Sequence, residues 1–163
     1  MMIMMQLILS ASLAEHQMRN RTIVFDLDDT LYAEEDYVLS GKRSVATFIL
    51  DYFHRDMREK IIAADDFLTI IVDELQLPDA VKTSLLWHYR LHDPIINLRP
   101  GAATCIASLR QRGDAICIVT DGRSVTQRLK IRALGLDPDA IFISEEVGAE
   151  KPSPQAFETV ERQ

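Results

Sequence analysis

A cluster of acidic and hydroxyl side chains, Asp26-Leu27-Asp28-Asp29-Thr30, follows the first strongly apolar run of the chain. Asp26 and Asp28 are one residue apart, so both can border one site if the chain curls after that run. Two carboxylates this close resist joint ionisation unless a cation neutralises one of them. An ionised Asp26 could attack a phosphorus atom while a protonated Asp28 donates to the leaving oxygen. The alternative is an acidic turn or helix cap without catalytic function.

Two further segments carry groups that suit a phosphate. Thr120-Asp121-Gly122 follows a second apolar run and offers a hydroxyl with free backbone N–H groups, which can cradle phosphate oxygens. Lys151 lies in a proline-rich loop and could bring a cation to the phosphate and to the aspartates. Each segment alone has an ordinary explanation, a glycine-containing turn or a surface lysine. The order of the three along the chain is more specific than any one of them.

Apolar patterns predict that these groups lie at one edge of a parallel sheet. The runs 22–27, 115–120 and 141–144 are typical of strands, and we expect the first two to be buried on both faces. Open α/β sheets bind ligands beyond the carboxyl ends of such strands. Apolar residues at helical spacing predict helices between the strands. These helices are expected near 42–53, 61–75, 78–92, 101–113 and 124–136, and from about 155 onward.

The helix after Gly122 carries an apolar and a basic face. Its apolar stripe should pack inward, against the sheet. Arg128 and Arg132 should face water as an ordinary solvated surface. The stripe consists of Val125, Leu129, Ala133 and Leu136. This alternation of strands and helices predicts an α/β fold.

The segments FDLDDTLY, IVTDG and EEVGAEKPSP resemble the first three motifs of the haloacid dehalogenase (HAD) superfamily, in its phosphatase branch, over residues 22–157. The resemblance implies a Rossmann-like parallel sheet with helices on both faces. It implies that Asp26 is a nucleophile that becomes an aspartyl phosphate, and that Asp28 is the general acid and base. Mg²⁺ would bind the Asp26 carboxylate and the Asp28 main-chain carbonyl. The phosphate-binding set would be Thr120, Asp121, Gly122 and Lys151.

The same resemblance divides the chain into parts. Residues 19–34 and 98–163 would form the HAD-like core, after an N-terminal extension over residues 1–18. Residues 35–97 would form a small all-helical cap that closes over the site and selects the substrate. We expect the two junctions of this cap with the core to lie close together in space.

A fourth family motif, which supplies a further Mg²⁺ ligand, has no counterpart after the Lys151 segment. Glu145 and Glu146 belong to the ordinary family loop before that lysine, and we do not expect them to replace the ligand of the missing fourth motif. We therefore expect an incomplete core, weaker Mg²⁺ binding and feeble phosphatase activity. The strand 22–27 would lose a neighbour, and its open edge could pair with another chain unless residues 3–9 cover it.

Composition restricts the partners and the compartment. A net charge of -7 and a pI near 5.0 argue against a partner with a nucleic-acid backbone. No apolar run approaches the ~20 residues that a membrane helix needs, and Met1–Ala14 lacks the basic start of a signal peptide. Two cysteines are too few for a disulfide framework. We expect a cytoplasmic protein that acts on a small phosphorylated metabolite.

Several other interpretations stay open. The main one is a truncated, inactive HAD-like protein that retains only the fold or a binding function. A phosphomutase or a phosphate-receiver signalling domain would also use an aspartyl phosphate, but the helical insert after the first motif does not fit a receiver. His88 and His92 are four residues apart, which permits a metal site, although helix packing is the simpler explanation.

Overall fold

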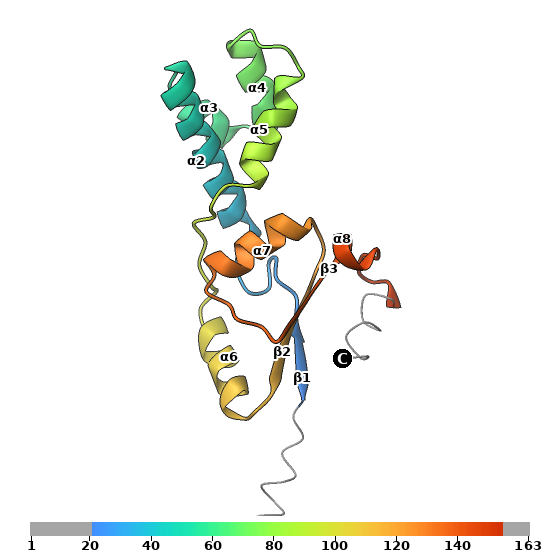
Figure 1. The fold of residues 1–163 in the computed structure, drawn as a ribbon. Helices are drawn as coiled ribbons and strands as arrows, with labels where there is room; N and C mark the ends of the chain where they lie inside the picture. Colours follow the sequence, from blue (N-terminus) through green and yellow to red (C-terminus); the bar gives the residue numbers. More distant parts are fainter. Residues whose placement is uncertain (1–20, 155–163) are drawn as a thin grey trace, which may run out of the picture.

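A parallel sheet of three strands, in the order β1-β2-β3, forms the base of the structure, a computed structural model that describes residues 21–154 (Figure 1). In the register of the sheet, Phe25 pairs with Ile118 and Thr120 pairs with Ile143. Because the strands are parallel, their carboxyl ends meet at one edge. The strands are β1 (Thr22–Phe25), β2 (Ala115–Thr120) and β3 (Ala140–Ile143).

Helices cover both faces of this sheet, which confirms the predicted α/β fold. On one face, Ile118 packs in a cluster with Ile131 and Leu134 of the α7 segment and with partly buried Ile106 of α6. On the other face, Cys117 and its neighbours pack against Val147 of α8. Successive strand residues point to opposite faces, so β2 contributes to both clusters. The three helices are α6 (Ala102–Gln111), α7 (Ser124–Ala133) and α8 (Ser144–Val147).

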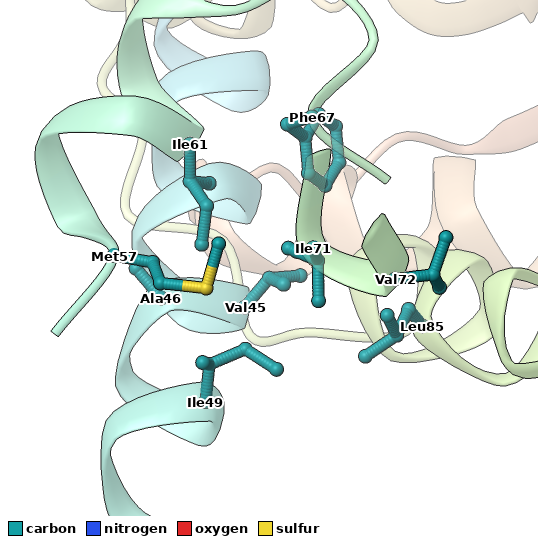
Figure 2. Packing of buried hydrophobic residues seen from close by; sticks show 9 residues of the cluster. All are labelled: Val45, Ala46, Ile49, Met57, Ile61, Phe67, Ile71, Val72 and Leu85. Atoms are coloured by element: carbon teal, nitrogen blue, oxygen red, sulfur yellow. The ribbon is translucent and has the colours of Figure 1, made fainter. Parts of the chain in front are cut away.

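The four other described helices pack on one another around a hydrophobic cluster of their own, here called the helical cluster (Figure 2). In Figure 1 they extend beyond the carboxyl edge of the sheet. The helices are α2 (Glu34–Phe53), α3 (Arg58–Ala63), α4 (Phe67–Glu74) and α5 (Val81–Arg90). The buried members of the helical cluster are Val45, Ala46, Ile49, Met57, Ile61, Phe67, Ile71, Val72 and Leu85.

The two connections between the sheet and these helices run side by side. The Arg99 backbone N–H donates to the carbonyl of Leu31 at 2.8 Å, and the Arg99 guanidinium lies 3.4 Å from the carbonyl of Tyr32. The chain therefore leaves the sheet portion and returns to it at one place.

The structure corrects several expected elements. The helix expected over 61–75 is broken, because Asp66 accepts a hydrogen bond from the Thr69 backbone N–H and starts α4 as an N-cap. The helix expected over 78–92 is shorter, and residues 91–99 are not helical. β1 is not buried on both faces. It lies at an edge of the described sheet, and Val24 is 41% exposed.

The inward stripe predicted for α7 is wrong at Val125 and Ala133, which are exposed, whereas Leu129 is partly buried and Leu136 packs against the cluster that contains Ile118. The buried residues of the helix itself are Gln127, Lys130 and Ile131. Three expectations fall outside the described residues: the extension over 1–18, the strand substitute over 3–9 and the helix from about 155. Within residues 21–154, no helix is long and apolar enough to span a bilayer.

Candidate active site

The structure brings the first aspartate and the predicted lysine together at the carboxyl edge of the sheet. The Lys151 ammonium pairs with Oδ1 of Asp26 and lies 3.3 Å from the carbonyl oxygen of Val119. The Thr30 hydroxyl donates to the other carboxylate oxygen, Oδ2, at 2.9 Å. The Asp26 side chain stays 38% exposed, so its carboxylate lies at the protein surface and has room for a ligand.

The chain curls directly after β1, as the chemistry of the aspartate pair requires. The Leu31 backbone N–H donates to the carbonyl of Leu27 at 3.0 Å, and Asp29 takes a positive φ of 56°. Aspartate tolerates this left-handed conformation better than most residues, because its short polar side chain can bond locally. The curl sends Asp26 and Asp28 to different partners.

Asp28 is turned inward and receives three donors. The Lys130 ammonium lies 2.6 Å from its Oδ1, the Gln127 amide nitrogen lies 2.6 Å from its Oδ2, and the Tyr32 hydroxyl also donates to Oδ1. Burial alone raises the pKa of the Asp28 carboxyl. Hydrogen bonds from Lys130 and then Tyr32, together with the lysine's charge, outweigh burial and hold the pKa below its ordinary value.

This environment favours the ionised form of Asp28. An ionised carboxylate suits the base that accepts a proton from water. The first step assigned to Asp28 in the sequence analysis, donation to a leaving oxygen, needs the protonated form instead. The arrangement described here is therefore the one that suits the second step.

The second predicted segment, residues 120–122, contacts one partner of each aspartate, Lys151 for Asp26 and Gln127 for Asp28. The Asp121 carboxylate accepts the Lys151 backbone N–H at 3.1 Å, which places the lysine loop. Thr120 is buried, and its hydroxyl oxygen accepts from the Gln127 amide at 2.7 Å. The Gly122 backbone N–H, expected to be free for phosphate, donates to the Ser144 hydroxyl at 2.9 Å. In this arrangement, neither the Thr120 hydroxyl nor the Gly122 N–H is free.

The two glutamates at the start of α8 bind α7 and so fix the same segment. Glu145 accepts the backbone N–H of Ser124 at 2.7 Å and pairs with Arg123 at 2.9 Å. Arg128 Nη2 donates to both carboxylate oxygens of Glu146, each at 2.9 Å, and Arg128 Nε donates to Oε1 at 3.1 Å. A carboxylate at a helix N-terminus satisfies free N–H groups there. Both glutamates are thus engaged in holding α7 in place.

Gln127 and Lys130 are the site residues that the sequence analysis missed. They lie three residues apart on α7, and both are buried. Together with Ile131 and Leu134 they follow the i, i+3, i+4, i+7 spacing of a buried helical stripe. The sequence contains this spacing, but the apolar residues of the helix taken alone predict that a different face is buried.

An open cleft of about 260 Å³ lies beside Asp28, where α2, α5 and α7 face one another. Burial raises the pKa of the Tyr37 hydroxyl there to about 12, so it stays protonated and can donate hydrogen bonds. The cleft is lined by polar groups of mixed charge, because the carboxylates of Asp28, Glu34 and Asp121 face it together with cations and hydroxyl groups. Its lining includes Tyr37, Tyr89, Arg90, Arg123, Thr126 and Lys130.

The two histidines at metal-like spacing have hydrogen-bond partners in the protein. His88 lies 3.2 Å from the Ser44 hydroxyl. His92 donates from Nδ1 to the Tyr89 carbonyl at 2.6 Å, and its Nε2 lies 3.1 Å from the Ser40 hydroxyl. Over residues 21–154, no group of three His, Cys, Asp or Glu side chains could hold a metal ion.

The donors at the carboxyl edge nevertheless fit Mg²⁺ in kind. Mg²⁺ takes oxygen ligands and usually keeps several waters, so it needs few protein donors. The exposed Asp26 carboxylate has lone pairs beyond those that its two hydrogen bonds use. With the main-chain carbonyl of Asp28, it forms the oxygen pair that the resemblance assigns to the metal.

Comparison with known proteins decides the family. A model described as haloacid dehalogenase-like hydrolase matches residues 20–163. The chain belongs to this family. It is similar to the glyceraldehyde 3-phosphate phosphatase of Methanocaldococcus jannaschii, with 26% identity over 153 residues. That match covers 83% of this chain and 67% of the archaeal enzyme. The resemblance drawn from the three sequence motifs is confirmed.

Solved structures of other proteins show the same fold. YfnB from Bacillus subtilis, solved bound to magnesium, matches with a TM-score of 0.56 and 22% identity over 89% of this chain and 73% of YfnB. CbbY from Rhodobacter sphaeroides, solved in complex with phosphate, matches with a TM-score of 0.53 and 21% identity over 88% of this chain and 72% of CbbY. These matches confirm the Rossmann-like fold class.

Proposed function

We propose that this HAD hydrolase is a Mg²⁺-dependent phosphatase that hydrolyses a small phosphate monoester through an aspartyl phosphate on Asp26. The observation that carries the proposal is the pairing of Asp26 with Lys151, two residues 125 positions apart, at the carboxyl edge of the sheet. The naming of the archaeal relative as a phosphatase supports the same reaction.

The proposed reaction has two steps. In the first, an Asp26 carboxylate oxygen forms a bond to phosphorus, the bond from phosphorus to the ester oxygen breaks, and Asp28 gives that oxygen a proton. In the second, Asp28 takes a proton from water, the water oxygen attacks phosphorus, and the bond to Asp26 breaks. The products are an alcohol and inorganic phosphate, and both aspartates return to their starting forms.

Lys151 has the charge and position to balance the phosphoryl oxygens during both steps. Its ammonium already contacts the nucleophile, so an incoming phosphate would meet a fixed cation. Thr120, Asp121 and Gly122 complete the phosphate-binding set in this proposal, which requires the Thr120 hydroxyl and the Gly122 N–H to exchange their present partners for phosphate oxygens. Asp26 and the Asp28 carbonyl would hold Mg²⁺, which supplies neutralisation of phosphate charge when bound.

Residues 35–97 are the cap of the proposed enzyme. The helical cluster gives these helices a core of their own, and the neighbouring connections at Leu31 and Arg99 would act as one hinge region. The cleft beside Asp28 lies between this part and α7, where a cap would admit a substrate. Its volume of about 260 Å³ suits a substrate of a few carbons, such as a triose phosphate.

Phosphate release from a panel of monoesters that includes glyceraldehyde 3-phosphate tests the proposal. Asp26→Asn removes the nucleophile and should reduce turnover to background. Asp28→Asn should lower kcat by about 10²- to 10⁴-fold, the usual contribution of general acid–base catalysis. Asp29→Asn is the matched control, because it makes the same chemical change at an exposed carboxylate that binds Arg99 and the Glu34 N–H.

Retained turnover in Asp26→Asn would refute the aspartyl phosphate. Calorimetric titration with Mg²⁺ tests the metal separately from activity, and Asp26→Asn should weaken the binding. A wild-type chain that binds phosphate esters without releasing phosphate would favour the binding function over the enzyme.

A further inference from the structure

We propose that Gln127 and Lys130 are positioning residues, which hold the Asp28 carboxylate by its two oxygens and tie it to the phosphate-binding segment after β2. The inference rests on the proposed function, in which Asp28 moves the protons. It adds to that function a device on α7 that none of the three family motifs contains.

The main polar contact of Lys130 is its ion pair with Asp28. Its side chain is only 6% exposed, and its ammonium lies 2.6 Å from Oδ1 of Asp28. The ammonium also lies 4.3 Å from the centre of the Tyr37 ring, so an aromatic face covers another side of the charge. Burying a lysine is costly unless it is paired. The two arginines of the helix, Arg128 and Arg132, are by contrast exposed and form ion pairs at the surface.

Gln127 joins Asp28 to the second motif. Its amide nitrogen lies 2.6 Å from Oδ2 of Asp28, 2.7 Å from the Thr120 hydroxyl and 2.7 Å from the Asp121 carbonyl. An amide nitrogen carries two hydrogens, so three acceptors share two donors. The side chain is 1% exposed, and its carbonyl oxygen Oε1 has no hydrogen-bond partner among the described residues. The hydrogen bonds that Gln127 donates therefore explain why this polar side chain is buried.

These contacts distinguish positioning from simple packing. An apolar residue would fill the same volume at lower cost, since an unpaired buried polar atom is unfavourable. Each oxygen of Asp28 has a separate partner from α7, which restrains rotation of the carboxylate. A catalytic group misplaced by about 1 Å can cost ~10²-fold in rate. We therefore expect α7 to act on catalysis through the orientation of Asp28.

The leaving group of the substrate reveals this effect. An alkyl phosphate releases a basic alkoxide that needs a proton, whereas p-nitrophenyl phosphate releases a stable phenolate that needs none. Loss of Asp28 positioning should therefore slow the first step far more with alkyl esters than with the aryl ester, whereas the second step, in which Asp28 activates water, is common to both. Because kcat/KM includes only the steps up to formation of the aspartyl phosphate and release of the alcohol, it isolates this difference. A general loss of folded protein would slow both equally.

The test compares Lys130→Met and Gln127→Met with the wild-type chain on one alkyl phosphate and on p-nitrophenyl phosphate. We expect kcat/KM for the alkyl ester to fall about 100-fold, with less than about tenfold loss of kcat/KM for the aryl ester. Lys130→Arg, which keeps the charge, should restore part of the alkyl activity. Arg132→Gln, on the exposed side of α7, is the matched control and should leave both rates unchanged.

Equal losses of kcat/KM on the two esters would overturn the inference. A double-mutant cycle on urea unfolding, with Asp28→Asn and Lys130→Met, reads the contact without turnover. The double variant should be less destabilised than the sum of the single variants, by about tenfold in the unfolding constant. Additive effects would overturn the inference, whereas a wild-type chain inactive on every ester would instead refute the proposed function.

Discussion

Ile71→Ala should loosen the four helices α2 to α5 without loosening the sheet. Ile71 is fully buried in the helical cluster, so its replacement leaves a cavity between helices. Truncations of this kind cost about 2–5 kcal/mol. That is a large part of the ~5–15 kcal/mol that holds an ordinary domain together. The loss should be confined to the helices if residues 35–97 form a unit of their own.

Hydrogen exchange read by mass spectrometry measures this loss region by region. A loss of at least about 2 kcal/mol should speed the exchange of protected amides in the affected helices by roughly 25-fold or more. Amides of β2 and β3 should keep their rates. Ile95→Ala is the control, because Ile95 is 82% exposed and its truncation should change stability by less than ~0.5 kcal/mol.

Equal acceleration in the helices and the sheet would refute the reasoning. It would mean that the helices and the sheet unfold as one cooperative unit. Residues 35–97 would then not be a separate cap in the thermodynamic sense. The hinge placed at Leu31 and Arg99 would lose its physical basis.

Two further substitutions test particular contacts of α2 and α5. Gly41→Ala should destabilise the fold by about 1–3 kcal/mol, as measured by urea unfolding. Alanine favours helices, but its methyl group would lie 2.4 Å from a ring carbon of Tyr89. Unchanged or higher stability would contradict this packing. Burial holds the pKa of His92 below its ordinary value of about 6.5, so the unfolded chain binds this proton more readily than the folded one. The free energy of unfolding should therefore fall as the pH falls below that value. His92→Gln should make the urea midpoint depend less on pH between about pH 7 and pH 5. The same pH dependence in the variant as in the wild type would exclude His92 as the cause.

The sheet was predictable because its strands carry a strong local signal. The run Ala115–Thr120 has no charged residue and is buried along nearly its whole length. The exposed face of β1 was not predictable in the same way, since apolar composition alone does not reveal whether a strand lies at an edge. The break before α4 depends on a single side chain, Asp66, within a continuous apolar pattern.

The motif residues of the candidate site, and the sheet edge at which they meet, were predictable from their order along the chain. The motifs placed Asp26, Asp28, Thr120 and Lys151 at or beyond the carboxyl ends of strands, and a parallel sheet brings such segments to one edge. The partners of Asp28 were not predictable from motifs, because Gln127 and Lys130 lie inside a helix. A glutamine and a lysine at helical spacing ordinarily indicate a solvated face.

The direction of α7 explains why that ordinary expectation fails. The helix begins at Ser124, just beyond the carboxyl end of β2, and must return toward the amino ends of the parallel strands. Its first two turns therefore pass the site, where Gln127 and Lys130 meet a carboxylate and a threonine hydroxyl. Its later residues, such as Ile131, reach the apolar face of the sheet. In a helix that starts at an active site, the buried stripe changes from polar to apolar along its length, so hydrophobicity alone locates only its second half.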